Sequence, residues 1–319
     1  MRCDDGAAMT SADPSPAHWD PESCAQHLIQ ACTPQLEHAL GQGGAGIYLL
    51  IDPMLGDPVL PEVPPASMTR EALNALRAGP WERATHALQL PEPLGMDAAF
   101  APYLVALQDA QDPWLEASVR WAVQETVQSW MAEPDQQTPH RAGGWLQSAA
   151  QAEAVADLLS GWMHLRAAGA GKASYLRLGD RRAFSLAVHV LGSAHVARAM
   201  PPLQQWLWLD PQAALQSVVA APSTTATDST ALTLNNAKLR PLAHFSSAQW
   251  AQMALGPQVH QAMAQSMGQR LQQAGGPTPA QWQPVSADQW TNALEQARKN
   301  TGKRQSTSQH KKTQEGRQP

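Results

Sequence analysis

Cysteine is scarce in this sequence, and the three that occur are poorly placed for disulfide bonds. Cys3, Cys24 and Cys32 all lie near the start of the 319-residue chain. An odd number of cysteines without a CxxC pair provides no disulfide framework, so the pattern favours reduced thiols in a cytoplasmic protein. A small secreted domain held together by disulfides is therefore excluded.

Long apolar runs are also missing. No stretch approaches the roughly 18 consecutive apolar residues that a membrane-spanning helix needs. The first residues include Asp4 and Asp5, without the apolar segment that a Sec signal peptide carries. We therefore expect a cytoplasmic protein that does not insert into a membrane.

Charge is low overall and unevenly distributed. Charged residues make up 15% of the chain and hydrophobic residues 43%, a composition that supports a folded core. The net charge is −5, yet the segment from Arg298 onward is strongly basic, so the rest of the chain is acidic. An acidic body lacks the basic face that nucleic-acid binding requires. We predict no nucleic-acid partner and a basic, disordered tail over 299–319; a tail that tethers nucleic acid is the alternative.

Motifs for catalysis, cofactors and metals are absent. The Gly-rich run 169–174 resembles a phosphate-binding loop, but Arg166 replaces its first Gly and Ala173 replaces the hydroxyl residue that holds Mg²⁺. This run is therefore predicted to be only the turn of a hairpin. The eleven histidines include no pair at the spacing of a helical metal site, and no GxSxG motif occurs. We predict no catalytic residue, no cofactor and no metal ion.

Short apolar runs bounded by turn residues alternate with amphipathic stretches. The runs predict strands at Ile47–Pro53, Arg83–Leu90, Pro102–Leu107, 141–147, Tyr175–Leu178 and Trp206–Pro211. The stretches between them predict helices over 21–40, 68–78, 113–130, 148–163 and 180–191, with Ser148 and Gln151 as a capping box. This alternation is typical of a layered α/β domain, here expected over 19–219 after a disordered leader at 1–18. Whether the sheet is parallel or mixed stays open.

The last part of the chain differs in character. Residues 220–235 begin with Ala, Ser and Thr and are predicted to be a linker. Residues 236–298 contain three amphipathic helical stretches and no strand pattern, which predicts a small all-helical lobe. Trp250, Trp282 and Trp290 lie in this lobe, which is too short to bury three indoles easily. Because Trp is a frequent interface anchor, we expect these three to contact a partner.

Five short motifs occur in an order that is similar to a known family. They are YLLIDP at Tyr48–Pro53, APYLV at Ala101–Val105 followed by Trp114 and Leu115, WLQS at Trp145–Ser148, Leu176–Arg177 with Asp180 and Arg182, and the run Trp206–Trp208. Together they cover about residues 45–215. In order and spacing they resemble a domain-of-unknown-function family whose members are adaptor chaperones for the effectors of type VI secretion systems.

The resemblance implies a function and a set of partner-binding residues. It implies an adaptor that is not an enzyme, binds its cognate secreted effector in the cytoplasm and helps to load it onto the VgrG spike. The family pattern Arg-Phe-Tyr-Asp-Pro-Arg stands here as Arg177-Leu178-Gly179-Asp180-Arg181-Arg182, without the aromatic pair and the Pro. Arg177, Asp180 and Arg182 are retained, and we expect them to form a charged cluster at the edge of the sheet that binds the partner.

A second interpretation stays open. Catalytic groups can assemble from distant parts of a chain, so the absence of local motifs does not exclude an enzyme. The alternative is a hydrolase whose site forms near Asp52, Arg177 and Asp180 together with a histidine. Convergence of these groups in a deep cleft would favour it.

Overall fold

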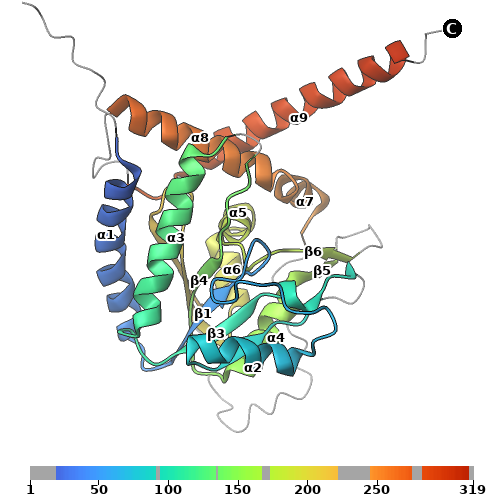
Figure 1. Cartoon of the computed structure of the whole chain (residues 1–319). Helices are drawn as coiled ribbons and strands as arrows, with labels where there is room; N and C mark the ends of the chain where they lie inside the picture. Colours follow the sequence, from blue (N-terminus) through green and yellow to red (C-terminus); the bar gives the residue numbers. More distant parts are fainter. Residues whose placement is uncertain are drawn as a thin grey trace, which may run out of the picture.

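The computed structural model describes residues 19–90, 94–133, 136–166, 173–221, 245–274 and 282–315. Within these ranges the chain has a mixed α/β fold in which helices pack on both faces of one sheet (Figure 1). The leader predicted over 1–18 lies outside the described residues, and so does nearly all of the linker predicted over 220–235.

Six strands of the described chain form one sheet, in the order β2-β3-β1-β4-β7-β8. They are β1 (Gly46–Ile51), β2 (Thr85–Ala87), β3 (Tyr103–Leu107), β4 (Ala142–Ser148), β7 (Leu203–Leu209) and β8 (Leu215–Val219). A separate hairpin joins β5 (His164–Arg166) to β6 (Ala173–Tyr175). A hairpin at this place agrees with the prediction, but its second strand begins within the Gly-rich run and ends at Tyr175, whereas the sequence predicted a strand over Tyr175–Leu178. Residues 167–172 lie outside the described residues.

The sheet is antiparallel, so the prediction of a parallel or mixed sheet was wrong. All of its strand pairs run antiparallel. The alternation of strands and helices remains informative about strand direction: β3 and β4 are joined by a helix and run in the same direction, as a βαβ unit would. However, β1 lies between them and runs the opposite way. The alternation of strands and helices along the chain constrains the direction of successive strands, but it does not decide which strands become neighbours in the sheet. Here the strand that lies next to both β3 and β4 is β1, which comes earlier in the chain.

Both faces of the sheet are buried under helices. Successive side chains of a strand point to opposite faces. Thus Leu49 of β1 joins an apolar cluster with one set of helices, whereas Leu50 joins a cluster with the other. The first set includes α1 (Pro21–Gly41) and α3 (Pro113–Met131), and the second includes α4 (Ala152–Met163), α5 (Arg181–Leu191) and α6 (Ser193–Ala199). Another helix, α2 (Arg70–Trp81), precedes the edge strand β2.

Aspartate starts three of these helices. Asp20, Asp112 and Asp180 each precede the first helical residue, and each carboxylate accepts a hydrogen bond from the backbone N–H of the second residue of its helix. Such caps satisfy donors that the helix itself leaves unpaired, and their negative charge is favourable at the positive end of the helix dipole. Asp112 and Asp180 are thus the N-caps of α3 and α5.

The structure departs from the sequence-based expectation in three local features. Helix α6 and strand β8 were not predicted, because both are short and only weakly patterned. The predicted capping box was also wrong: Ser148 belongs to β4, and its hydroxyl donates to the carbonyl of Pro202. Ser148 and Gln151 have the residue types and spacing of a capping box. However, β4 extends through Ser148, because Ser148 pairs with Gly46 of β1.

Three helices follow residue 245 and complete the core. They are α7 (Ser247–Met253), α8 (Gly256–Ala274) and α9 (Ala287–Glu315), called here the C-terminal helices. Val259 and Trp290 join one apolar cluster of the sheet, and Met267 joins the other. The C-terminal helices therefore share the cores of the sheet instead of enclosing one of their own. Helix α9 continues through most of the stretch 299–319, for which the sequence predicted a disordered tail.

In the part of the chain that the structure describes, no helix is both long and apolar enough to cross a membrane.

Candidate functional site

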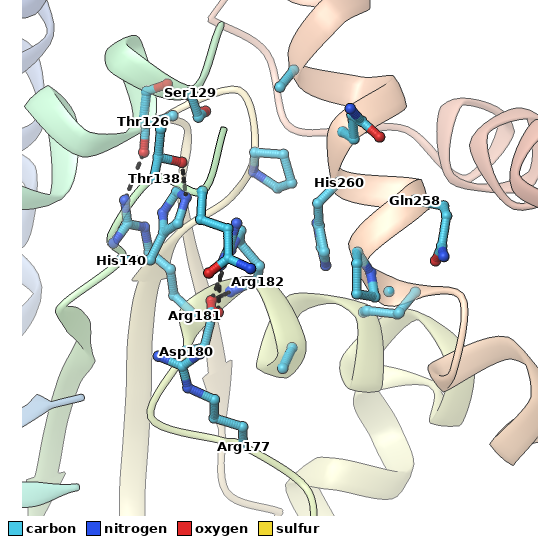
Figure 2. Close-up of a pocket in the computed structure, with 18 of the residues that line it drawn as sticks. Thr126, Ser129, Thr138, His140, Arg177, Asp180, Arg181, Arg182, Gln258 and His260 are labelled. Carbon is cyan, nitrogen blue, oxygen red and sulfur yellow. Dashed lines mark hydrogen bonds and ion pairs between the residues drawn. The ribbon is translucent and has the colours of Figure 1, made fainter. Parts of the chain in front are cut away.

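A cavity of about 950 Å³ lies where the C-terminal helices meet the rest of the fold (Figure 2). Its wall is formed by the end of α3, the connection from β6 to α5, the start of α5 and the end of β7, and it is closed by α7 and the first half of α8. Of the six residues predicted to bind a partner, Arg177, Asp180, Arg182 and Trp250 line it. Residues from six helices and strands, and from the connections between them, thus meet at one place.

Arg177 reaches Asp52 at the end of β1. Its Nε and Nη2 atoms donate to the two carboxylate oxygens of Asp52 over 2.6 and 3.0 Å. Asp52 is fully buried, and burial raises its pKa above the usual range despite the opposing attraction of the guanidinium. Its carboxylate also accepts the backbone N–H of Met54, which forms the turn after the strand. This ion pair fastens the β6–α5 connection to the centre of the sheet.

Asp180 and Arg182 form a second two-point ion pair. Nε of Arg182 donates to one carboxylate oxygen over 3.0 Å and Nη2 donates to the other over 2.7 Å. Although burial opposes ionisation, Arg182 and other neighbouring cations hold the pKa of Asp180 far below its usual range. The carboxylate of Asp180, which also caps α5, therefore stays ionised and cannot readily deliver a proton.

The third arginine of the motif, Arg181, was not predicted to be important. It is 2% exposed and lies between α3 and β4. Its guanidinium donates to Glu125 over 3.2 Å and to the carbonyls of Ala122 and Ala142 over 2.7 and 3.2 Å. Glu125 in turn accepts Nε of Arg141 over 2.6 Å. A weak sequence signal existed, since Glu125 is the only charged residue between Arg120 and Glu133.

Two glycines allow this charged connection to lie against the sheet. A Cβ at Gly143 of β4 would overlap the carbonyl oxygen of Gly179, and a Cβ at Gly179 would come within 3.0 Å of the Cβ of Asp52. A side chain at either position would push the connection that carries Arg177 and Asp180 away from the sheet.

Two buried histidines also line the cavity, and sequence analysis did not select them. His140 precedes β4, and its Nε2 lies 3.3 Å from Oγ1 of Thr138. His260 of α8 faces it, with Arg182 between them (Figure 2). Burial and the charge of Arg182 lower the pKa of His260 to about 3, and burial, Arg181 and Arg182 lower that of His140. Both rings are therefore neutral near pH 7.

The three predicted tryptophans occupy different environments. Trp250 is half-buried, packs on Phe245 and lines the cavity. Trp282 stacks on Trp130 with ring centroids 6.0 Å apart, outside the cavity lining. Trp290 is only 5% exposed and stacks on His189. Of the three, only Trp250 combines partial exposure with a place in the cavity wall.

Three comparisons with known proteins leave the family open. No protein-family model, no curated protein and no solved structure matches this chain.

The chemistry available at the cavity is mainly that of hydrogen bonding. Its arginines are engaged by carboxylates, and its histidines are neutral. Among the described residues, no group of three or more His, Cys, Asp or Glu side chains could hold a metal ion. The arrangement suits recognition of a ligand by paired and neutral polar groups.

Acidification is expected to destabilise the fold through the buried histidines. The unfolded chain binds a proton at His260 below about pH 6.5, whereas the folded chain does so only near pH 3. Stability therefore falls as the pH drops between these values, by about 3 kcal/mol at pH 4 for this ring. Urea unfolding at pH 7, 5.5 and 4.5 should show a shallower loss for His260→Gln than for the wild type. Identical pH dependence in both proteins would contradict this assignment.

Proposed function

We propose that this chain is a cytoplasmic, non-catalytic adaptor chaperone that binds a type VI secretion effector and helps to load it onto the VgrG spike. In this proposal the α/β part carries the family motifs, and the C-terminal helices act as the lobe that selects the cargo. The observation that carries it is the cavity where these parts meet. Its wall includes Arg177, Asp180 and Arg182 from the motif, and Trp250 from α7.

The state of three carboxylates at the site supports binding over catalysis; Asp210, which also lines the cavity, is the exception, because burial raises its pKa to about 6. Asp52 and Asp180 each hold an arginine at two points, and Glu125 is held between Arg141 and Arg181. A general acid or base needs a proton that it can exchange near neutral pH. Carboxylates that are engaged in this way serve better to hold the cavity wall in shape than to transfer protons.

Co-expression with the effector encoded next to this chain tests the proposal. The two proteins should copurify, and the amount of soluble effector should rise relative to expression alone. An effector from an unrelated gene cluster, expressed in the same way, is the control. Absence of a complex with every adjacent candidate would overturn the proposal.

Substitution of Trp250 is expected to weaken this complex. Truncation of a buried aromatic anchor commonly lowers affinity tenfold or more, so Trp250→Ala should have an effect of about that size. Trp114→Ala is the matched control, because Trp114 is also half-buried but lies at the opposite end of α3 from the cavity. Affinity can be measured by isothermal titration calorimetry. Equal losses in both variants would contradict a role of the cavity in binding.

A hydrolase remains the second candidate, and one observation favours it. Asp52, Arg177 and Asp180 converge near the same cavity as His140, and their pKa values are shifted. The hydroxyl group of Thr138 lies within hydrogen-bond distance of the His140 ring. Turnover of ester, amide or glycoside substrates by the purified chain, lost on His140→Gln, would favour this candidate over the adaptor.

A further inference from the structure

Several polar atoms in the cavity wall have no hydrogen-bond partner within the described protein. They are Nδ1 of His140, both ring nitrogens of His260, the indole N–H of Trp250 and the side-chain oxygen of Gln258. His140 is 3% exposed and His260 8%. Buried polar atoms are nearly always paired in folded proteins. Unpaired atoms on facing sides of one cavity indicate that a ligand or water completes their bonds.

The charge of the wall selects against an ionic ligand. Each of the three motif arginines faces a carboxylate: Arg177 faces Asp52, Arg181 faces Glu125, and Arg182 faces Asp180. An anion would have to compete with these carboxylates, and a cation would be repelled by the guanidinium groups. Since the two histidines are neutral as well, an uncharged ligand meets the smallest electrostatic penalty.

The unpaired atoms include both donors and acceptors. A neutral imidazole has one N–H donor and one acceptor nitrogen, the indole N–H of Trp250 donates, and the oxygen of Gln258 accepts. A peptide backbone presents the complementary groups, because each residue other than proline offers one N–H and one C=O. A ligand that displaces water from such a site must reproduce the hydrogen bonds of that water. The cavity of about 950 Å³ is at the upper end of the range for ligand pockets.

We infer that this cavity binds an uncharged, extended segment of the effector, whose backbone amides hydrogen-bond with His140 and His260. This inference rests on the proposed adaptor function and specifies what the adaptor recognises. His260 is placed to do so by α8, the helix that closes the cavity.

The first test uses the wild-type chain and peptides with blocked ends. Overlapping peptides covering the effector encoded next to this chain are immobilised and probed with the purified protein. Peptides that bind should be consecutive in the effector sequence and have a net charge near zero. Binding dominated by peptides with two or more charges of one sign would overturn the inference, even if the whole proteins form a complex.

The second test separates hydrogen bonding from shape. His260→Phe keeps a ring of similar size but removes both nitrogens, and it should weaken binding of the effector and of the best peptide about tenfold or more. His260→Gln restores one donor and one acceptor and should recover part of that loss. His189→Phe is the matched control, because His189 also contacts the ring of Trp290 but does not line the cavity.

The outcomes distinguish this inference from the proposed function. If wild type and His260→Phe bind the effector equally well, the adaptor function stands and the inference is wrong. If the wild type binds no effector, the proposed function itself fails. Thermal unfolding of each variant shows whether it is folded, and if His260→Phe does not fold, the peptide array on the wild type still decides.

Discussion

Replacing Arg181 with methionine is expected to lower the free energy of unfolding by about 3–5 kcal/mol. The substitution leaves the buried carboxylate of Glu125 with only one cationic partner, Arg141, whose side chain is 30% exposed. It also removes the bonds that Arg181 donates to the carbonyls of Ala122 and Ala142, although Thr126 still donates to the first of these. Removing one partner of a buried ion pair leaves a buried charge uncompensated, which is strongly destabilising. Urea unfolding followed by circular dichroism at pH 7 measures the effect.

A surface ion pair is the matched control for this experiment. Arg120 bonds to Glu116 one turn earlier on α3, and both side chains are substantially exposed. Arg120→Met should change the free energy of unfolding by no more than about 0.5 kcal/mol, since exposed pairs of this type contribute little. Adding Glu125→Gln to Arg181→Met should recover part of the loss, because the unpaired charge is then removed. A loss below about 1 kcal/mol for Arg181→Met would contradict this account of the buried network.

Replacing Gly268 with valine is the second substitution expected to have a large effect. Gly268 lies where α8 crosses the end of α3, and a Cβ there would overlap the backbone carbonyl oxygen of Trp130. The obstacle is backbone, which cannot rotate away as a flexible side chain can. Trp130 is further held by its indole N–H, which donates to the carbonyl of Pro211 over 3.0 Å. The two helices must therefore move apart.

Overpacking of a tight contact typically costs about 1–3 kcal/mol. Because the obstacle here is backbone, we expect a cost at or above the upper end of this range, about 3 kcal/mol or more. The neighbouring side chains Met267 and Leu271 are fully buried and would lose part of their packing. Because α8 also closes the cavity, Gly268→Val should weaken the effector complex as well. Thermal and urea unfolding give the first quantity, and calorimetric titration gives the second.

Gly79 provides the control for Gly268. It lies within α2, and a Cβ there would meet no atom within 4 Å. Gly79→Ala should therefore change stability far less than Gly268→Val does, because alanine favours the helix by about 0.5–1 kcal/mol whereas a Cβ directly before Pro80 opposes the helical conformation. If Gly268→Val unfolds at the same urea concentration as the wild type, the contact between α8 and α3 is less close than the structure indicates.

The candidate site could be predicted only in part. Arg177, Asp180 and Arg182 could be selected because they lie within six consecutive positions that resemble a family pattern. His140 and His260 could not, because each is a single histidine in an ordinary context, 120 positions from the other. Their relation exists only because α8 folds back over the end of α3 and the start of α5. Arg181 was set aside as a departure from the pattern, yet its burial makes it the best-bonded arginine of the three.

The amino-acid sequence by itself determined most of the helices and five of the six strands of the sheet. Local causes were sufficient there: apolar periodicity, turn residues, and the aspartates that begin α1, α3 and α5. Tertiary structure alone decided three other features: the antiparallel strand order, the sharing of both cores by the C-terminal helices, and the cavity between these helices and the rest of the fold. The reason is physical. Periodicity reports which side of an element is apolar, whereas the surface that covers this side is chosen by packing between residues far apart in the chain.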